Sequence, residues 1–293
     1  METLTDAQAE HFLDNGYIKI PRCFDRQVAD EWRALAFERL GYDEHDASTW
    51  SEERVHLPGM NSADVRDFAP DAYGAICDVM GGEERIAGPL HWGDGFIINF
   101  TVRANEPWQP PSAAAPGWHK DGDWFKHFLD GPEQGLLTIV IWSDIEPRSG
   151  GTFVASDSIA PVARFLRDRP QGCLPAEVRF GSLIGECREF DEVTGEVGDV
   201  FLLHPYMLHA ASGNPSGRPR FITNPPVSLR EPMCFHRPNG DYSLVERAVL
   251  RGLGVESLDF RMTSQRERVV PERETRQRKM LQEQQERLRT KTA

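Results

Sequence analysis

The chain has 293 residues, 39% of them hydrophobic, and carries a formal net charge of −13 at pH 7. This length is enough for one sizeable core, and the acidic balance argues against a nucleic-acid partner or an anionic membrane surface. The five cysteines are scattered without a Cys-x-x-Cys pair, and the sequence shows neither a leader pattern nor a long apolar window. We therefore expect a reduced, cytoplasmic protein with no membrane span.

The N-terminal third of the chain alternates helix and strand patterns. Thr5 and Gln8 form a capping-box pair and Gly16 is a stop signal, which together predict a short first helix. Apolar residues at helical spacing after Asp25 predict a second, amphipathic helix. The expected elements are a helix at 5–15, a strand at 17–20, a helix at 25–40, a charged loop at 41–70, a helix at 72–80 and a strand at 96–102.

The middle of the chain has mainly strand patterns. A Pro- and Ala-rich segment at 105–117 predicts a long loop. The apolar run at 198–209 is followed by the turn sequence Asn-Pro-Ser-Gly and a second short apolar run, which predicts a hairpin. Further strands are expected at 136–142, 151–155 and 178–183.

The C-terminal segment differs in composition from the rest. Beyond Met262 the residues are mainly Arg, Glu and Gln, and a helix over 272–289 would be polar on every side. Such a helix is either solvent-exposed or poorly ordered. We expect one domain at 1–261 and a charged helical or disordered appendage at 262–293, and the sequence leaves the oligomeric state open.

A candidate metal site begins at Trp118-His119-Lys120-Asp121-Gly122. Side chains two residues apart on a strand leave the same face, so His119 and Asp121 would point at one spot. One further histidine would complete a 2-His-1-carboxylate triad, which holds Fe(II) and leaves coordination positions open. His209, at the end of the apolar run, offers that histidine.

An arginine follows the second histidine at a useful distance. The expected hairpin carries His209 on one arm and Arg220 near the start of the other. A dicarboxylate cosubstrate such as 2-oxoglutarate can chelate iron through its keto acid end, while its far carboxylate needs a cation. Arginine suits that role because its planar fork binds a carboxylate bidentately and stays charged when desolvated.

The order His119-Lys120-Asp121, Gly198-Asp199 leading into His209, and then Arg218-Pro219-Arg220 resembles the phytanoyl-CoA dioxygenase family of Fe(II)/2-oxoglutarate-dependent oxygenases. The N-terminal segment from Leu4 to Ile18 is similar to the helix-then-strand opening of that family. The resemblance covers roughly residues 4 to 230, with the motif residues as its most specific part.

The resemblance implies a mainly β fold, a double-stranded β-helix or jelly roll of the cupin type with flanking N-terminal helices. It implies that His119, Asp121 and His209 are iron ligands and that Arg220 binds the far carboxylate of 2-oxoglutarate. Trp142 matches a tryptophan that some members place against 2-oxoglutarate. The implied activity is hydroxylation of a small metabolite with O2, giving succinate and CO2, with ascorbate as a possible supporting reagent. A related halogenase subgroup has a small residue in place of the carboxylate, so Asp121 favours an oxygenase.

Other interpretations stay open. A cupin-type isomerase or lyase would use a metal without 2-oxoglutarate, and a binding protein would keep the barrel without turnover. His204 is expected to be a packed residue and Arg218 a rim residue, while Trp124, Phe125 and Phe128 suit either a core or an apolar pocket. The substrate is not identified by the sequence.

Overall fold

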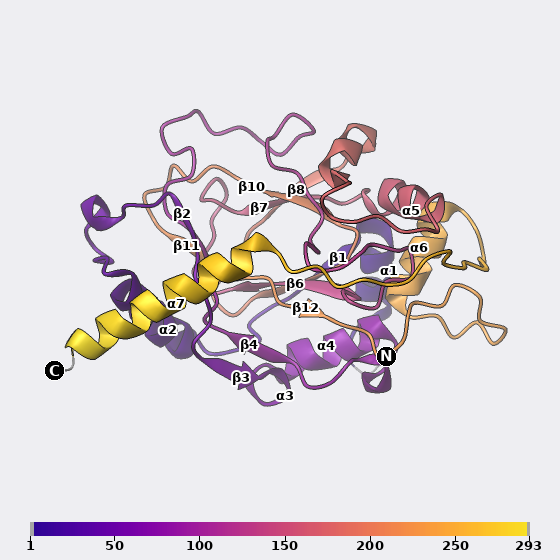
Figure 1. Cartoon of the computed structure of the whole chain (residues 1–293), viewed down its shortest axis with the longest axis horizontal. Helices are drawn as coiled ribbons and strands as arrows, with labels where there is room; N and C mark the ends of the chain where they lie inside the picture. Colours follow the sequence, from indigo (N-terminus) through magenta and orange to yellow (C-terminus); the bar gives the residue numbers. More distant parts are fainter. Residues whose placement is uncertain (1–2, 292–293) are drawn as a thin grey trace.

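The computed structural model describes residues 3–291, and its centre is built from antiparallel sheets (Figure 1). The strands are β1 (Tyr17–Ile20), β2 (Arg54–His56), β3 (Ser62–Asp64), β4 (His91–Gly93), β5 (Ile97–Asn99), β6 (Leu136–Ile141), β7 (Thr152–Ala155), β8 (Phe190–Val193), β9 (Val200–Leu203), β10 (Leu208–Ala211), β11 (Arg220–Thr223) and β12 (Pro226–Val227).

Two of the sheets matter for the site. The larger has the order β1-β9-β6-β11-β5-β2, with β12 also paired to β6, and the smaller has the order β10-β7-β8. A third sheet consists of β3 and β4 alone. Neighbouring strands run antiparallel in the pairs that the described chain forms.

Helices surround these sheets, and more of the described residues lie in helices than in strands. In Figure 1, α1, α5 and α6 gather at one end of the sheets, and α7 crosses in front of them toward α2. Within residues 3–291 we find no helix with the length and apolar character needed to cross a bilayer. The helices are α1 (Asp6–Asn15), α2 (Arg26–Leu40), α3 (Val65–Phe68), α4 (Pro70–Met80), α5 (Ile159–Arg167), α6 (Leu244–Leu253) and α7 (Glu272–Lys291), with 3-10 turns at Ala47–Thr49, Glu83–Arg85 and Phe180–Glu186.

Strand alternation separates two apolar clusters on the two faces of β6. Leu137, Ile139 and Ile141 belong to a cluster that also contains residues of β7 and β8, so this cluster lies between the larger and the smaller sheet. Val140, on the opposite parity, joins the main core that includes helix residues. Since successive side chains leave opposite faces of a strand, the inner face can line a cavity while the outer face packs against helices.

Most of the predicted N-terminal elements are confirmed. Thr5 and Gln8 form the predicted capping box of α1, and Gly16 ends the helix with φ 72° in the left-handed region. Asp25 caps α2 by accepting a hydrogen bond from the backbone N–H of Gln27. The prediction of a loop over 41–70 is wrong in part, because β2, β3 and α3 lie there. Their strands are three residues long, too short to give a clear periodic pattern.

The predicted hairpin is wrong. β10, which carries His209, pairs with β7 in the smaller sheet, whereas β11, which begins at Arg220, pairs with β5 and β6 in the larger one. The connecting turn therefore crosses between sheets. The strand expected at 178–183 is also wrong, since a 3-10 turn begins at Phe180.

Helix α7 contacts the body of the protein. It lies along α2, and the side chain of Gln284, only 2% exposed, accepts hydrogen bonds from Nε and Nη2 of Arg39 at 3.0 and 2.9 Å. Arg39 also forms an ion pair with Asp94 at 3.0 Å, and neither side chain is exposed. Asp94 in turn accepts hydrogen bonds from the backbone of residues 60 and 61. The division of the chain at residues 261 and 262 stays a prediction.

Candidate metal centre and cavity

The two histidines of the predicted triad are joined through their backbones. The N–H of His119 donates to the carbonyl of His209 at 3.0 Å, and the N–H of His209 donates back at 2.9 Å. His119 lies in this isolated bridge and not in a strand, which corrects the expectation that His119 and Asp121 lie on a strand. Asp121 follows two residues later. The bridge links the 118–122 segment to β10, so residues far apart in sequence meet.

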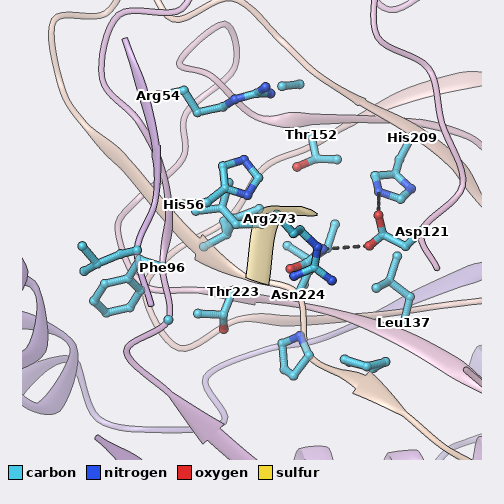
Figure 2. A pocket seen from close by; sticks show the side chains of 18 of the residues that line it. Arg54, His56, Phe96, Asp121, Leu137, Thr152, His209, Thr223, Asn224 and Arg273 are labelled. Atoms are coloured by element: carbon cyan, nitrogen blue, oxygen red, sulfur yellow. Dashed lines mark hydrogen bonds and ion pairs between the residues drawn. The ribbon is translucent and has the colours of Figure 1, made fainter. Parts of the chain in front are cut away.

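The side chains of His119, Asp121 and His209 converge. One ligand atom from each lies within 4.8 Å of the others. Oδ1 of Asp121 lies 3.4 Å from Nε2 of His119 and 3.4 Å from Nε2 of His209, and Figure 2 shows the Asp121 carboxylate beside the His209 ring. Two imidazoles and one carboxylate on one side of a site form the donor set of a facial triad.

Backbone carbonyls orient both imidazole rings. Nδ1 of His119 lies 2.8 Å from the carbonyl of Gly117, and Nδ1 of His209 lies 3.1 Å from the carbonyl of Met207. A carbonyl only accepts hydrogen bonds, so each Nδ1 carries the proton. When a ring is neutral, its lone pair is therefore on Nε2, which faces Asp121. Metal-binding histidines are held in this way by a hydrogen bond from the other ring nitrogen, so the donor set fits a divalent cation.

The electrostatics of the triad favour a carboxylate anion. Burial alone would raise the pKa of Asp121, but the charges and hydrogen bonds of His209 and His119 hold it well below its usual range. Burial likewise opposes protonation of His119, yet Asp121 outweighs it and raises that pKa. A positive charge beside Asp121 is thus favoured, and either imidazole protons or a metal ion can supply it.

The triad opens into a cavity of about 1320 Å³. Leu137 and Ile139 of β6 and Ile222 of β11 give it an apolar wall, and Trp124 also lines it. Trp124, Phe125 and Phe128 were expected in either a core or a pocket; Trp124 lines the pocket, whereas Phe125 and Phe128 are buried in the core. Ligand pockets for drug-sized molecules typically measure roughly 300–1,000 Å³, so this cavity has room for two small molecules.

Arg220 lines the same cavity and is 2% exposed. Its Nε donates to the carbonyl of Gly150 at 2.7 Å and its Nη1 to the carbonyl of Ile97 at 3.3 Å. Burial first, and then the charge of Arg54, lower the pKa of Arg220 to about 9, which leaves the guanidinium charged at neutral pH. No carboxylate among the described side chains forms an ion pair with it. A buried cation of this kind calls for an anion.

Trp142 lies elsewhere. It is fully buried and stacks with Trp32 and Phe68 on the outer, helix-covered side of the larger sheet. Trp142 directly follows β6. Side chains alternate between the two faces of a strand, and the odd-numbered Leu137 and Ile139 point into the cavity, so the even-numbered Trp142 points to the opposite face. The indole N–H donates to Oγ1 of Thr223 at 3.0 Å, and Thr223 lines the cavity. The tryptophan thus contacts the cavity wall and is not itself part of the lining.

The structure brings residues to the cavity that the sequence did not single out. Arg54 and His56 come from β2, and Arg273 comes from α7 (Figure 2). Burial, followed by the charges of Arg54, Arg220 and Arg273, lowers the pKa of His56. The polar-apolar alternation of Arg54 to Leu57 is the one signal for β2 in the sequence. Nothing in the composition of α7 indicates a contact with a cavity.

Two neighbouring residues have structural partners. His204 is fully buried, with Nε2 3.3 Å from the carbonyl of Val245 and Nδ1 accepting from the N–H of Tyr206 at 3.1 Å, so it is packed as expected. Arg218 forms an exposed ion pair with Glu146 at 2.7 Å and is a surface residue as expected.

Comparisons with known proteins give structures but no family. No protein-family model matches the sequence, and no curated protein matches it. The alpha ketoglutarate dependent carbocyclase SnoK from nogalamycin biosynthesis is 16% identical, with a TM-score of 0.45, and the match covers 78% of this chain and 85% of SnoK. HygX from Streptomyces hygroscopicus, with nickel and 2-oxoglutarate bound, is 17% identical with a TM-score of 0.43, over 75% of this chain and 85% of HygX.

A third similar structure is EctD from S. alaskensis with 2-oxoglutarate and 5-hydroxyectoine. It is 16% identical with a TM-score of 0.38, and the match covers 75% of this chain and 74% of EctD. At identities and scores this low the likeness is too weak to support an argument about activity.

Proposed function

We propose that this chain is an Fe(II)- and 2-oxoglutarate-dependent oxygenase that hydroxylates an unactivated C–H bond of a small-molecule metabolite. One observation supports this most directly: a single cavity is lined both by the two histidines and the carboxylate of the triad and by Arg220. Arg220 is a buried cation without a carboxylate partner among the described side chains. The proposal includes a jelly-roll fold of the phytanoyl-CoA dioxygenase type, with the cavity between the two facing sheets, and a cytoplasmic location.

The residues have separate roles in this proposal. His119, Asp121 and His209 would hold the iron, and Arg220 would bind the far carboxylate of 2-oxoglutarate. Bound iron and 2-oxoglutarate supply the activation of O2, with succinate and CO2 as coproducts. The protein orients the ligands through Gly117, Met207 and Asn224, and the apolar walls formed by β6 and β11 exclude water from the reacting groups.

Trp142 has a supporting role in the proposal. Its hydrogen bond to Oγ1 of Thr223 fixes a residue of the cavity wall close to Asn224. The indole itself does not line the cavity, because the ring stacks within the helix-covered core.

Two other functions make different predictions. A cupin-type isomerase or lyase would bind the metal but not 2-oxoglutarate, so Arg220 would have no cosubstrate carboxylate to bind. A non-catalytic binding protein would bind a ligand without consuming 2-oxoglutarate. The convergence of three ligand atoms with oriented imidazoles favours a metal centre over simple binding.

The test combines metal binding with cosubstrate turnover. Purified protein is given Fe(II), ascorbate and 2-oxoglutarate, and bound iron and released succinate are measured. We expect about one iron per chain, the content of a single triad site, and slow succinate release. His119→Ala, Asp121→Ala and His209→Ala should each lose the iron, whereas His91→Gln, at an exposed position outside the cavity lining, should retain it.

The outcomes separate the alternatives. Iron binding without succinate release would support the cupin-type enzyme. Absence of both would leave the non-catalytic binding protein. Retention of iron by the His209 variant would refute the ligand assignment.

A further inference from the structure

The cavity has a charge balance opposite to that of the chain. Over the whole sequence, 46 Asp and Glu residues outnumber 33 Lys and Arg residues. Clefts lined by one sign of charge concentrate ligands of the opposite sign. The lining contains five cations against three carboxylates, namely Arg54, Arg103, Lys120, Arg220 and Arg273 against Glu53, Asp121 and Asp123.

Three of these cations already have partners. Arg273 forms an ion pair with Asp123 at 2.6 Å. Arg103 donates to the carbonyl of Ala211 at 2.7 Å. Lys120 donates to the carbonyl of Asp121 at 3.0 Å and lies over aromatic rings, 5.5 Å from the centroids of both Phe125 and Phe180. These three side chains are held in place by contacts within the protein.

Arg54 is different. Across residues 3–291 its side chain forms no hydrogen bond and no ion pair, and Glu53, adjacent in sequence, is not its partner either. His56, two residues on, has a side chain that likewise lacks a hydrogen-bond partner within that range. Val55 between them is 4% exposed, so strand alternation places Arg54 and His56 together on the cavity face of β2.

The sheet register fixes the distance between Arg54 and Arg220. Both residues are paired with Asn99, Arg54 from β2 and Arg220 from β11, on opposite sides of β5. Neighbouring strands lie about 4.7–4.9 Å apart, so the two backbones are separated by roughly 10 Å. The side chains of Arg54 and Arg220 therefore leave the backbone at separate positions along one wall of the cavity.

We propose that Arg54 and His56 form a second anion-binding position, which selects a substrate that carries one carboxylate or phosphate group. This deepens the proposed function and rests on it in one respect, namely that 2-oxoglutarate occupies Arg220. Within the iron and cosubstrate positions alone the charges then balance without Arg54, because Fe(II) and Arg220 are matched by Asp121 and the two carboxylates of 2-oxoglutarate. Arg54 remains for the substrate.

The apolar residues of the lining indicate that the rest of the substrate is apolar. Phe96 and Trp124 join Leu137, Ile139 and Ile222 in the cavity wall. With about 1320 Å³ available, an organic acid or phosphate ester with an apolar body fits beside the cosubstrate. The guanidinium would bind the anionic end by a charge-assisted, bidentate contact.

The test uses matched probes that differ in charge. Protein loaded with Ni(II) and saturated with 2-oxoglutarate is titrated with benzoate, phenyl phosphate and benzamide, and binding is followed by ligand-observed NMR. We expect at least one anion to bind about tenfold more tightly than benzamide, as a hydrogen bond to a charged group allows. The tighter of the two anions identifies the group as a carboxylate or a phosphate.

Two variants assign the preference to a residue. Arg54→Gln should bring the anion and benzamide to within about twofold of each other, because the charged contact is lost. Arg276→Gln removes the same charge from an exposed position on α7 outside the cavity lining and should keep the preference. An anion preference that is absent from the original protein, or unchanged in Arg54→Gln, would overturn the inference.

The cosubstrate provides the remaining control. If the anion preference disappears when 2-oxoglutarate is added, Arg54 belongs to the cosubstrate position and the inference is wrong. Binding of Ni(II) and 2-oxoglutarate is measured on the same samples. Should neither bind while the preference still depends on Arg54, the anion position stands and only the proposed oxygenase function fails.

Discussion

The side-chain amide of Asn224 donates a hydrogen bond of 2.7 Å to Oδ2 of Asp121 (Figure 2). Asn224 directly follows β11, the strand that begins with Arg220. The same strand therefore supplies the buried cation at one end and orients the triad carboxylate at the other. With Oδ2 held by the amide, Oδ1 is left to face the two imidazoles.

Asn224→Ala should weaken metal binding. Outer partners that orient a metal ligand typically contribute about 10- to 100-fold in affinity, and we expect a loss of that size for Fe(II) or Ni(II), measured by isothermal titration. Asn105→Ala, at an exposed position outside the cavity lining, is the matched control. Unchanged affinity in the Asn224 variant would show that the carboxylate needs no such support.

Arg220→Ala should raise the 2-oxoglutarate requirement while leaving metal binding nearly intact. Removing one partner of a buried charge pair costs about 3–5 kcal/mol, so the Kd for 2-oxoglutarate should rise at least about a hundredfold. Arg220→Lys keeps the charge but loses the planar fork, so its Kd for 2-oxoglutarate should lie between those of the original protein and Arg220→Ala. An Arg220→Ala enzyme with the original 2-oxoglutarate dependence would exclude the assigned role.

His204 should make the protein less stable in acid. Burial lowers its pKa from the ordinary 6.5 to about 3, so between these pH values the unfolded chain binds a proton that the folded chain does not. The stability is complete above pH 6.5 and falls as the pH drops below it. At pH 5 the loss from this residue is about 2 kcal/mol relative to neutral pH.

Urea unfolding at pH 7.5 and pH 5 measures this effect. His204→Gln removes the titrating group and should show a smaller difference between the two pH values, whatever its stability at pH 7.5. His91→Gln, at an exposed position, should keep the full difference. Equal pH dependence in the His204 variant would contradict the explanation.

Gln284→Ala should destabilise the fold by about 1–3 kcal/mol, because the buried guanidinium of Arg39 would lose its acceptor for Nε. Gln285→Ala changes the exposed neighbour and should have little effect. Denaturant titration measures both. A neutral Gln284 variant would favour the interpretation of residues 262–293 as an appendage.

Local signals predicted local structure well. The capping box of Thr5 and Gln8 and the stop at Gly16 appear in α1 as expected, because capping depends on residues within one turn. The apolar run at 136–142 likewise forms β6. Short strands such as β2 were missed, since three residues show too little periodicity and their pairing depends on distant partners.

The ligand types that this protein offers can be recognised from the sequence alone. His119 and Asp121 are two residues apart, and His209 and Arg220 follow in an order that predicts a metal centre beside a cation. How these residues come together depends on the fold. His209 and Arg220 reach the cavity from different sheets, Trp142 lies on the opposite face of β6, and Arg54, His56 and Arg273 join from segments without a recognisable motif. Strand pairing and side-chain parity depend on contacts between residues far apart in the chain, and no local pattern encodes such contacts.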